Sequence, residues 1–371
     1  MTRRILHVID HLGSGGAQTV LLYLLKYRDT ARFEYTVASL HGRGPMAAEL
    51  ESIGVRVVSL SAHKWPPGYL LALPRLLRSG QFDLVHFHLF GANWIAKPIA
   101  WLMGCRVLFN HDHCNDTMRD NTFFLMVDHF TNQLSTRILA VSISVTKFLR
   151  DRENIPDARL EYFPNGADVA AFPPATSEAR QAARAQWNLP ADAFLIGGVG
   201  RLVAQKDFST FLAIAAQIQE QQPKVHFVIF GDGPEETELK QKARSLGLEN
   251  RVTFVGFVTG RTAIYAALDL LLLTSRYEGT PMVLLEAMLS QVPIVASSVD
   301  GTTEILRDKE SALFFPPGAP AAGAAALRTL LHDPAQRTRL ADKARRDAIE
   351  HFNAEKQMKH LESLYDYTLA L

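Results

Sequence analysis

The sequence has little of what marks several classes of protein. It contains two cysteines in 371 residues, Cys105 and Cys114, too few for a disulfide framework and without the spacing of a zinc site. This usage favours a reducing cytoplasm. No apolar run approaches the roughly 20 residues of a membrane-spanning helix. The apolar run before Asp10 is short, so it predicts a first β-strand and not a signal peptide.

An excess of charge is also absent. The formal net charge is +1, which does not favour nucleic acid as a partner. The charge is uneven, because residues 1–150 carry 16 Lys and Arg against 10 Asp and Glu, with nine of the thirteen histidines. At 371 residues and 47 % hydrophobic composition, the chain is long enough for two domains, each with its own core.

Short β-rich runs alternate with helical stretches throughout the chain, a pattern that predicts βα units and parallel sheets. A polar, Pro- and Ala-containing stretch near residues 172–192 interrupts the pattern and predicts a linker. We therefore expect an α/β protein with one doubly wound domain at residues 1–172 and a second at residues 187–352. The expected strands are residues 5–10, 35–40, 55–60, 84–88, 106–111, 137–142, 160–166, 194–200, 226–233, 252–257, 268–275, 293–298 and 311–316.

The segment SRYEGTPMVLLEAMLSQVPIVAS, residues 275–297, is apolar enough to be buried, yet it contains Glu278 and Glu286. Thr280 is expected to cap a helix that begins at Pro281. The free N–H groups of its first turn would attract phosphate, whereas the flanking carboxylates would bind hydroxyls. A nucleotide-sugar contains both phosphate groups and hydroxyl groups. The alternative, in which both glutamates pair with arginines in a structural network, stays open.

Several segments, in this order and spacing, resemble the family-four retaining glycosyltransferases of the GT-B fold. They are GVGRLVAQKDF, FGDGPE, VTFVGFV and YEGTPMVLLEAMLSQVPIVASSVDGTTEIL, with GSGGAQ and VLFNHD in the first domain. The resemblance implies two Rossmann-like domains that face each other across a cleft. It also implies that the C-terminal helix, residues 353–371, crosses back to the first domain.

The resemblance implies a role for each matching residue. Arg201 and Lys206 would neutralise the donor diphosphate, and Glu278 would lie near the transferred sugar. Glu286 would accept hydrogen bonds from the ribose, and His111 would lie beside the sugar. The expected catalytic residues are His111, Arg201, Lys206 and Glu278. The expected substrate-binding residues are Gly15, Gly16, Asn165, Gly231, Gly233, Phe257, Val258, Gly279, Thr280, Pro281, Met282, Val283, Leu284 and Glu286.

Some of these positions also fit plainer structures. Gly231 with Gly233, and Asn165 with Gly166, could form ordinary turns. Gly15 and Gly16 allow close approach to phosphate or sugar, but the loop is not a dinucleotide fingerprint, since Gln18 replaces its last glycine.

Four histidines of the first domain are candidate metal ligands. His86, His88, His111 and His113 could share faces of two strands, but no second shell of partners is evident, so no metal is expected. The chain also lacks the Asp-x-Asp that holds a divalent ion in the other main glycosyltransferase fold. No cofactor is expected either, because the nucleotide-sugar is a co-substrate.

The predicted function is transfer of a hexose or N-acetylhexosamine from a nucleoside-diphosphate sugar, with UDP favoured, to a glycan or lipid-linked glycan. Retention of configuration and a role in cell-envelope polysaccharide synthesis follow from the resemblance. The alternatives are a nucleotide-sugar epimerase of the same fold and a non-catalytic nucleotide-sugar-binding subunit. Residues 63–80, with Trp65 and Arg78, predict peripheral contact with an anionic membrane at the inner face of the plasma membrane, although a core-packed helix explains them too.

Overall fold

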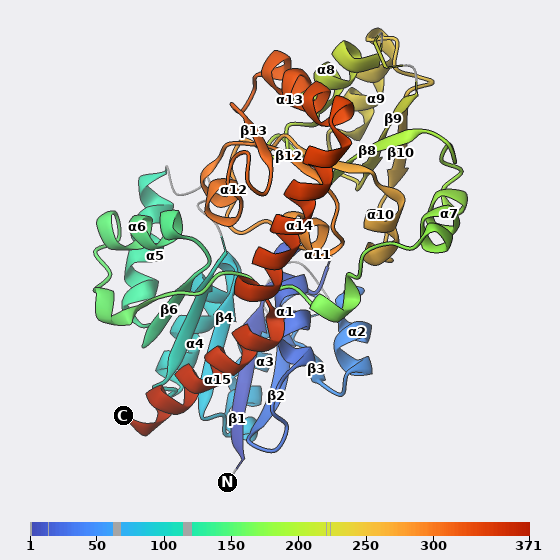
Figure 1. Ribbon diagram of the computed structural model, residues 1–371. Helices are drawn as coiled ribbons and strands as arrows, with labels where there is room; N and C mark the ends of the chain where they lie inside the picture. Colours follow the sequence, from blue (N-terminus) through green and yellow to red (C-terminus); the bar gives the residue numbers. More distant parts are fainter. Residues whose placement is uncertain (1, 14, 62–67, 114–120, 220, 223) are drawn as a thin grey trace. The chain divides into compact units, whose positions relative to one another are not determined.

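The computed structural model describes residues 2–13, 15–61, 68–113, 121–219, 221–222 and 224–371. It divides into two compact units (Figure 1). The first comprises Met1–Ala167 and Ala354–Leu371, and the second comprises Asp168–Asn353. Each unit contains one wholly parallel sheet with helices, and all thirteen expected strands are present. The predicted fold class, including the return of the C-terminal helix to the first unit, is confirmed.

The first unit has a seven-stranded sheet in the order β3-β2-β1-β4-β5-β6-β7. Its strands are β1 (Arg3–Ile9), β2 (Phe33–Ser39), β3 (Arg56–Ser59), β4 (Leu84–His88), β5 (Leu108–Asp112), β6 (Arg137–Ala140) and β7 (Leu160–Tyr162). Its helices are α1 (Gly16–Lys26), α2 (Met46–Ser52), α3 (Gly68–Gly80), η1 (Ala92–Ala96), α4 (Lys97–Leu102), α5 (Thr122–Gln133), α6 (Ile143–Asp151), η3 (Asp157–Arg159) and α15 (Ala354–Ala370).

The two faces of this sheet differ in chemistry. Leu6, Val8 and Phe87 belong to an apolar core that also includes residues of α3 and α4. Alternation along the strands places His7 and His86 on the opposite face. There the hydroxyl of Tyr365, from α15, lies 2.5 Å from Nδ1 of His86. The C-terminal helix therefore covers a polar face of the sheet.

Helix α3 includes the described part of the segment considered for membrane contact. Its Tyr69, Leu73, Leu76 and Leu77 are buried in the core of the first unit, whereas Leu70 and Leu71 are exposed. Trp65 lies outside the described residues. Core packing thus accounts for most of the apolar side chains in α3. Within the described part of the chain, no helix has both the length and the apolarity needed to cross a membrane.

The second unit has a six-stranded sheet in the order β10-β9-β8-β11-β12-β13. Its strands are β8 (Phe194–Val199), β9 (Val225–Phe230), β10 (Val252–Gly256), β11 (Leu270–Leu273), β12 (Ile294–Ser297) and β13 (Leu313–Phe315). Its helices are η4 (Val169–Ala171), α7 (Ser177–Gln186), α8 (Phe208–Gln219), α9 (Glu236–Ser245), α10 (Arg261–Ala267), α11 (Met282–Leu289), α12 (Asp300–Ile305), α13 (Pro320–His332) and α14 (Pro334–His351).

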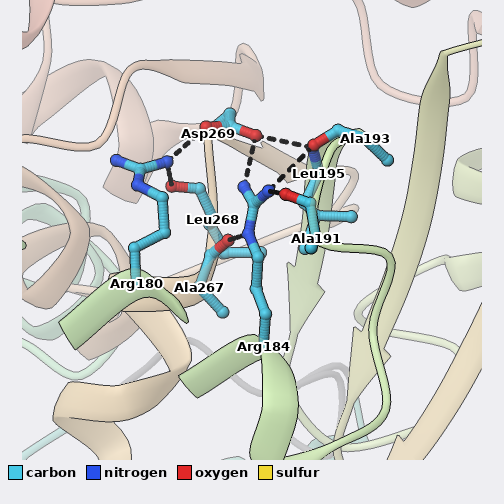
Figure 2. Close-up of polar contacts among 8 residues, drawn as sticks. All are labelled: Arg180, Arg184, Ala191, Ala193, Leu195, Ala267, Leu268 and Asp269. Carbon is cyan, nitrogen blue, oxygen red and sulfur yellow. Dashed lines mark hydrogen bonds and ion pairs between the residues drawn. The ribbon is translucent and has the colours of Figure 1, made fainter. Parts of the chain in front are cut away.

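The prediction that residues 172–192 form a loose linker is wrong. Helix α7 lies within this stretch, belongs to the second unit and packs against α10. Figure 2 shows the reason: Arg184 of α7 is buried and donates to Asp269 and to three backbone carbonyls, those of Ala191, Ala193 and Ala267. Asp269 also accepts from the N–H of Leu195, at the start of β8. The polar sequence of this stretch did not indicate a helix, because the buried ion pair of Arg184 with Asp269 that holds α7 cannot be inferred from it.

Asp269→Ala should lower the free energy of unfolding of the second unit by about 3–5 kcal/mol, because it leaves the buried Arg184 charge without its counter-ion. Urea denaturation followed by circular dichroism measures the loss. Arg180→Ala is the matched control, since Arg180 lies on the same helix and pairs with the same carboxylate. Its side chain is 36 % exposed against 6 % for Arg184, so we expect a loss of at most about 1 kcal/mol. Equal losses in the two variants would contradict this account.

Candidate functional site

The loops that follow β8 and β11 are held together by hydrogen bonds. The hydroxyl of Thr274 donates to the carbonyls of Lys206 and Asp207, at 2.9 and 3.0 Å. The Gln205 amide donates to the carbonyl of Tyr277, and the N–H of Arg276 donates to the carbonyl of Gln205. Because β8 and β11 are parallel neighbours, both loops leave the same edge of the sheet. In such sheets this edge is where ligands bind.

Lys206 and Glu278 meet between these two loops. Nζ of Lys206 lies 2.5 Å from Oε1 of Glu278, and the two side chains are 16 % and 6 % exposed. The hydroxyl of Ser275 donates to the same oxygen at 2.6 Å. The structure thus brings together two of the expected catalytic residues and gives Glu278 partners from the protein itself.

Arg201 lies at the start of the loop after β8, and its side chain is exposed. Its guanidinium forms no hydrogen bond or ion pair with any residue that the structure describes. The preceding Gly200 and the following Leu202 are fixed by backbone hydrogen bonds to Phe230 and Asp232. An exposed cation on an anchored loop is therefore available to an anion at this edge of the sheet.

Glu286 is 2 % exposed on α11. Arg261 Nη1 lies 2.5 Å from its Oε1, and the hydroxyl of Tyr265 donates to its Oε2 at 2.8 Å. Both partners come from α10. Bound substrate is therefore not needed to supply the donors to this carboxylate, contrary to our interpretation of the sequence. Arg261 and Tyr265 were missed because nothing in the pattern VTGRTAIY distinguishes them from ordinary helix residues.

The start of α11 differs by one residue from the prediction. Pro281 is the N-cap and Met282 the first helical residue, with no side-chain cap, so the capping role expected for Thr280 is wrong. Thr280, Met282 and Leu284 are buried, whereas Val283 is partly exposed. Helix α12 approaches the preceding loop closely, because a Cβ at Gly301 would lie 1.7 Å from the carbonyl oxygen of Gly279. Gly301 is a third residue that the sequence analysis did not single out.

Gly231 and Gly233 follow β9 and have φ angles of +135° and +158°. A Cβ at Gly231 would lie 1.9 Å from the carbonyl oxygen of Gly200, and one at Gly233 would lie 2.4 Å from that of Leu202. These glycines therefore allow the loop after β9 to pack on the loop that carries Arg201. After β10, Phe257 is exposed and Val258 partly exposed, as groups that meet a ligand would be.

Gly231→Ala should lower the free energy of unfolding by about 3–5 kcal/mol, because it adds backbone strain to a steric overlap. Differential scanning calorimetry measures the change. Gly247→Ala serves as the control: Gly247 has φ of +67° and no heavy atom within 4 Å of an added Cβ, so only the left-handed backbone penalty of about 1–2 kcal/mol applies. A Gly231→Ala protein no less stable than Gly247→Ala would refute the steric argument.

The expected residues of the first unit lie at separate places in it. Gly15 is the N-cap of α1 and Gly16 its first residue, at the carboxyl end of β1. Asn165 is buried. The adjacent Gly166 lies against the start of α15, where a Cβ would be 2.7 Å from Cα of Ala354. Asn165 thus precedes a glycine that packs where the C-terminal helix begins.

His111 belongs to a row of five histidines, of which four are buried on β1, β4 and β5 and the fifth, directly after β5, is partly exposed. The register pairs His7 with His86 and His88 with His111. Nδ1 of His7 lies 2.9 Å from Nε2 of His88, and Nδ1 of His88 lies 3.3 Å from Nε2 of His113. Neither ring nitrogen of His111 is hydrogen-bonded to any described residue. We define these five residues as the histidine row: His7, His86, His88, His111 and His113.

Burial keeps the histidine row neutral. It lowers the pKa of His7 and of His113 to about 3. For His86, His88 and His111 burial, followed by the neighbouring histidines, holds the pKa well below the ordinary 6.5. The rings are therefore neutral at pH 7, with one lone pair each. His111 therefore cannot act as a protonated general acid at that pH.

Known proteins match nearly the whole chain. Residues 14–171 match the family model described as Glycosyltransferase Family 4, and residues 179–347 match the one described as Glycosyl transferases group 1. EpsF of Bacillus subtilis is 28 % identical over 313 residues, which cover 81 % of this chain and 80 % of EpsF.

Two further similarities concern proteins with described roles. The lipopolysaccharide core biosynthesis glycosyltransferase LpsE of Rhizobium meliloti is 31 % identical over 172 residues, 46 % of this chain and 49 % of LpsE. The crystal structure of Anabaena HepE in complex with UDP-glucose superimposes with a TM-score of 0.87 over 98 % of this chain and 99 % of HepE, at 24 % identity. At that identity the likeness establishes the fold.

Proposed function

Because the chain belongs to the group 1 glycosyltransferases, we propose that it transfers a hexose or N-acetylhexosamine from a nucleoside-diphosphate sugar to a glycan or lipid-linked glycan hydroxyl. The observation that carries this proposal is the pairing of Lys206 with Glu278 beside the exposed Arg201. Two cations and a carboxylate at the ligand-binding edge of a parallel sheet suit a diphosphate bonded to a sugar. The HepE complex favours UDP as the nucleotide.

The diphosphate would lie against Arg201 and Lys206. As the bond to the sugar breaks, negative charge grows on the leaving phosphate oxygen, and the two cations would stabilise it. Lys206 is held by Glu278 at 2.5 Å, so the ammonium is already positioned before donor binds. Glu278 in turn can accept hydrogen bonds from sugar hydroxyls through the oxygen atom that Lys206 and Ser275 do not use.

Glu286 would bind the ribose. Its carboxylate accepts hydrogen bonds from Arg261 and from Tyr265, and a carboxylate has about four acceptor positions in all. Arg261 and Tyr265 fix the carboxylate so that little freedom is lost when ribose hydroxyls donate to it.

We further propose that configuration is retained at the anomeric carbon, that no metal is needed for transfer, and that the acceptor belongs to the cell envelope. The first two follow from the resemblance and from the two protein cations. The third is supported by LpsE, which acts in lipopolysaccharide core biosynthesis. The enzyme would then work in the cytoplasm, in peripheral contact with the inner face of the plasma membrane, where exposed Leu70 and Leu71 of α3 could touch lipid.

Glu286→Gln should weaken UDP binding about 10- to 100-fold, because hydrogen bonds to an ionised acceptor contribute about 1.5–3 kcal/mol. Isothermal titration calorimetry with UDP measures the change. Tyr265→Phe is the matched control, since it removes one donor to the same carboxylate and leaves the charge in place. We expect its affinity to stay within about threefold of the original. Unchanged UDP affinity in Glu286→Gln would contradict the ribose role.

Transfer should persist in EDTA and yield a product with the donor's anomeric configuration, whereas Lys206→Met should lower turnover about 10²- to 10³-fold. The reason is that protein cations, and not a metal ion, would neutralise the diphosphate. Proton NMR of fresh product gives the anomer, and release of nucleoside diphosphate gives the rate.

The control for this experiment is Lys240→Met, because Lys240 pairs with Glu236 on the surface of α9. Activity lost in EDTA and restored by magnesium would overturn metal independence, and an inverted product would overturn retention. Turnover of the nucleotide-sugar without any acceptor would indicate an epimerase. Binding without turnover would indicate a non-catalytic subunit.

A further inference from the structure

The histidine row has nitrogen atoms that hydrogen bonding within the protein does not use. One ring nitrogen each from His88, His111 and His113 lies within 4.8 Å of the other two. Both nitrogens of His111 and Nδ1 of His113 are buried without a hydrogen-bond partner among the described residues. A buried polar atom left without a partner is unfavourable and calls for an explanation. A metal ion bound by these three neighbouring imidazoles would supply the missing partner.

We propose that His88, His111 and His113 form a zinc site in the first unit. Neutral imidazole is a preferred zinc ligand, with nitrogen–zinc distances of about 2.0–2.1 Å, so that two ligands in a tetrahedral site lie about 3.3 Å apart. Nδ1 of His88 and Nε2 of His113 already have this separation, 3.3 Å. The ligand nitrogen of His111 lies within 4.8 Å of the other two. A shift of at most about 1.5 Å would bring it to the separation of about 3.3 Å that a tetrahedral zinc site needs.

The structure also provides the outer partner that such a site needs. With Nδ1 of His88 on the metal, its other nitrogen carries the proton and donates to Nδ1 of His7 at 2.9 Å. Zinc-binding histidines almost always donate in this way, which fixes the tautomer and the ring. This partner could not be predicted from the sequence, because His7 lies 81 residues from His88 in the chain.

The same distances also fit a metal-free chain of hydrogen bonds from His113 through His88 to His7. That chain does not require His111, whose nitrogens take no part in it. A zinc site does require His111, since two protein ligands alone hold zinc weakly. His111 therefore distinguishes the two arrangements.

Three protein ligands leave a fourth tetrahedral position for water or an anionic oxygen. The zinc site shares no residue with the proposed diphosphate site of Arg201 and Lys206. If His111 contacts the transferred sugar, as the resemblance implies, zinc and sugar compete for one imidazole. This second step rests on the proposed function, and it predicts slower transfer by the zinc-loaded protein.

The test uses the full chain without an affinity tag, stripped with EDTA and dialysed against Zn²⁺, with bound metal measured by atomic absorption. We expect one zinc per chain, and Co²⁺ in its place should give the visible absorption of a tetrahedral site. His111→Gln should weaken zinc binding at least about tenfold. The control is His86→Gln, which is equally buried and belongs to the other histidine triad, His7, His86 and His88.

Each outcome decides the proposal. No bound zinc, or equal binding by the original chain and by His111→Gln, overturns it in favour of the hydrogen-bonded chain. Loss of zinc in His86→Gln but not in His111→Gln overturns it in favour of the other triad. Circular dichroism checks that both variants fold, and His113→Asn provides a second ligand variant if His111→Gln does not. Zinc binding without slower transfer would leave the site in place and refute only the sugar contact of His111.

Discussion

The parallel pairing of β8 with β11 is the constraint on which the candidate donor site depends. It places the loops after both strands at one edge of the sheet, and the hydroxyl of Thr274 then holds the second loop to the carbonyls of Lys206 and Asp207. A shift between these strands would separate Lys206 from Glu278. Glycines at the end of β9 complete the arrangement, because only they allow the next loop to contact the backbone of Gly200 and Leu202.

Two buried carboxylates on one apolar segment are stable because the protein itself donates to them. Glu278 accepts from Lys206 and Ser275, and Glu286 accepts from Tyr265 and pairs with Arg261. Buried charges require such partners whether or not a substrate binds. Both carboxylates are consequently fixed in place before a donor arrives, which reduces the entropy that ordering would cost on binding. Structural pairing of these carboxylates is therefore compatible with the proposed ligand binding.

Most of the strands could be predicted from the sequence because they are short, β-rich apolar runs, such as β8, β9 and β11, that a parallel sheet buries. The partners of the buried charges could not be predicted from the sequence. Arg184 and Asp269 are 85 positions apart, and in the polar helix α7 only Ala183 and Arg184 are buried. Arg261 and Tyr265 are likewise defined only by the packing of α10 on α11. The N-cap at Pro281 was misplaced by one residue, since Thr280 has the right chemistry for a cap but is not used as one.

The histidine row connects the C-terminal helix to the candidate residues of the first unit. Tyr365 of α15 contacts His86, and Glu362 of the same helix accepts hydrogen bonds from the Tyr35 hydroxyl and the Asp29 N–H. Burial raises the pKa of Tyr365, so its hydroxyl keeps its proton and can serve as a donor to the row. A helix that covered the sheet with apolar side chains alone would leave His86 with no such partner. The polar contacts of α15 therefore help to explain why a row of histidines, and not the usual aliphatic residues, is tolerated across the centre of this sheet.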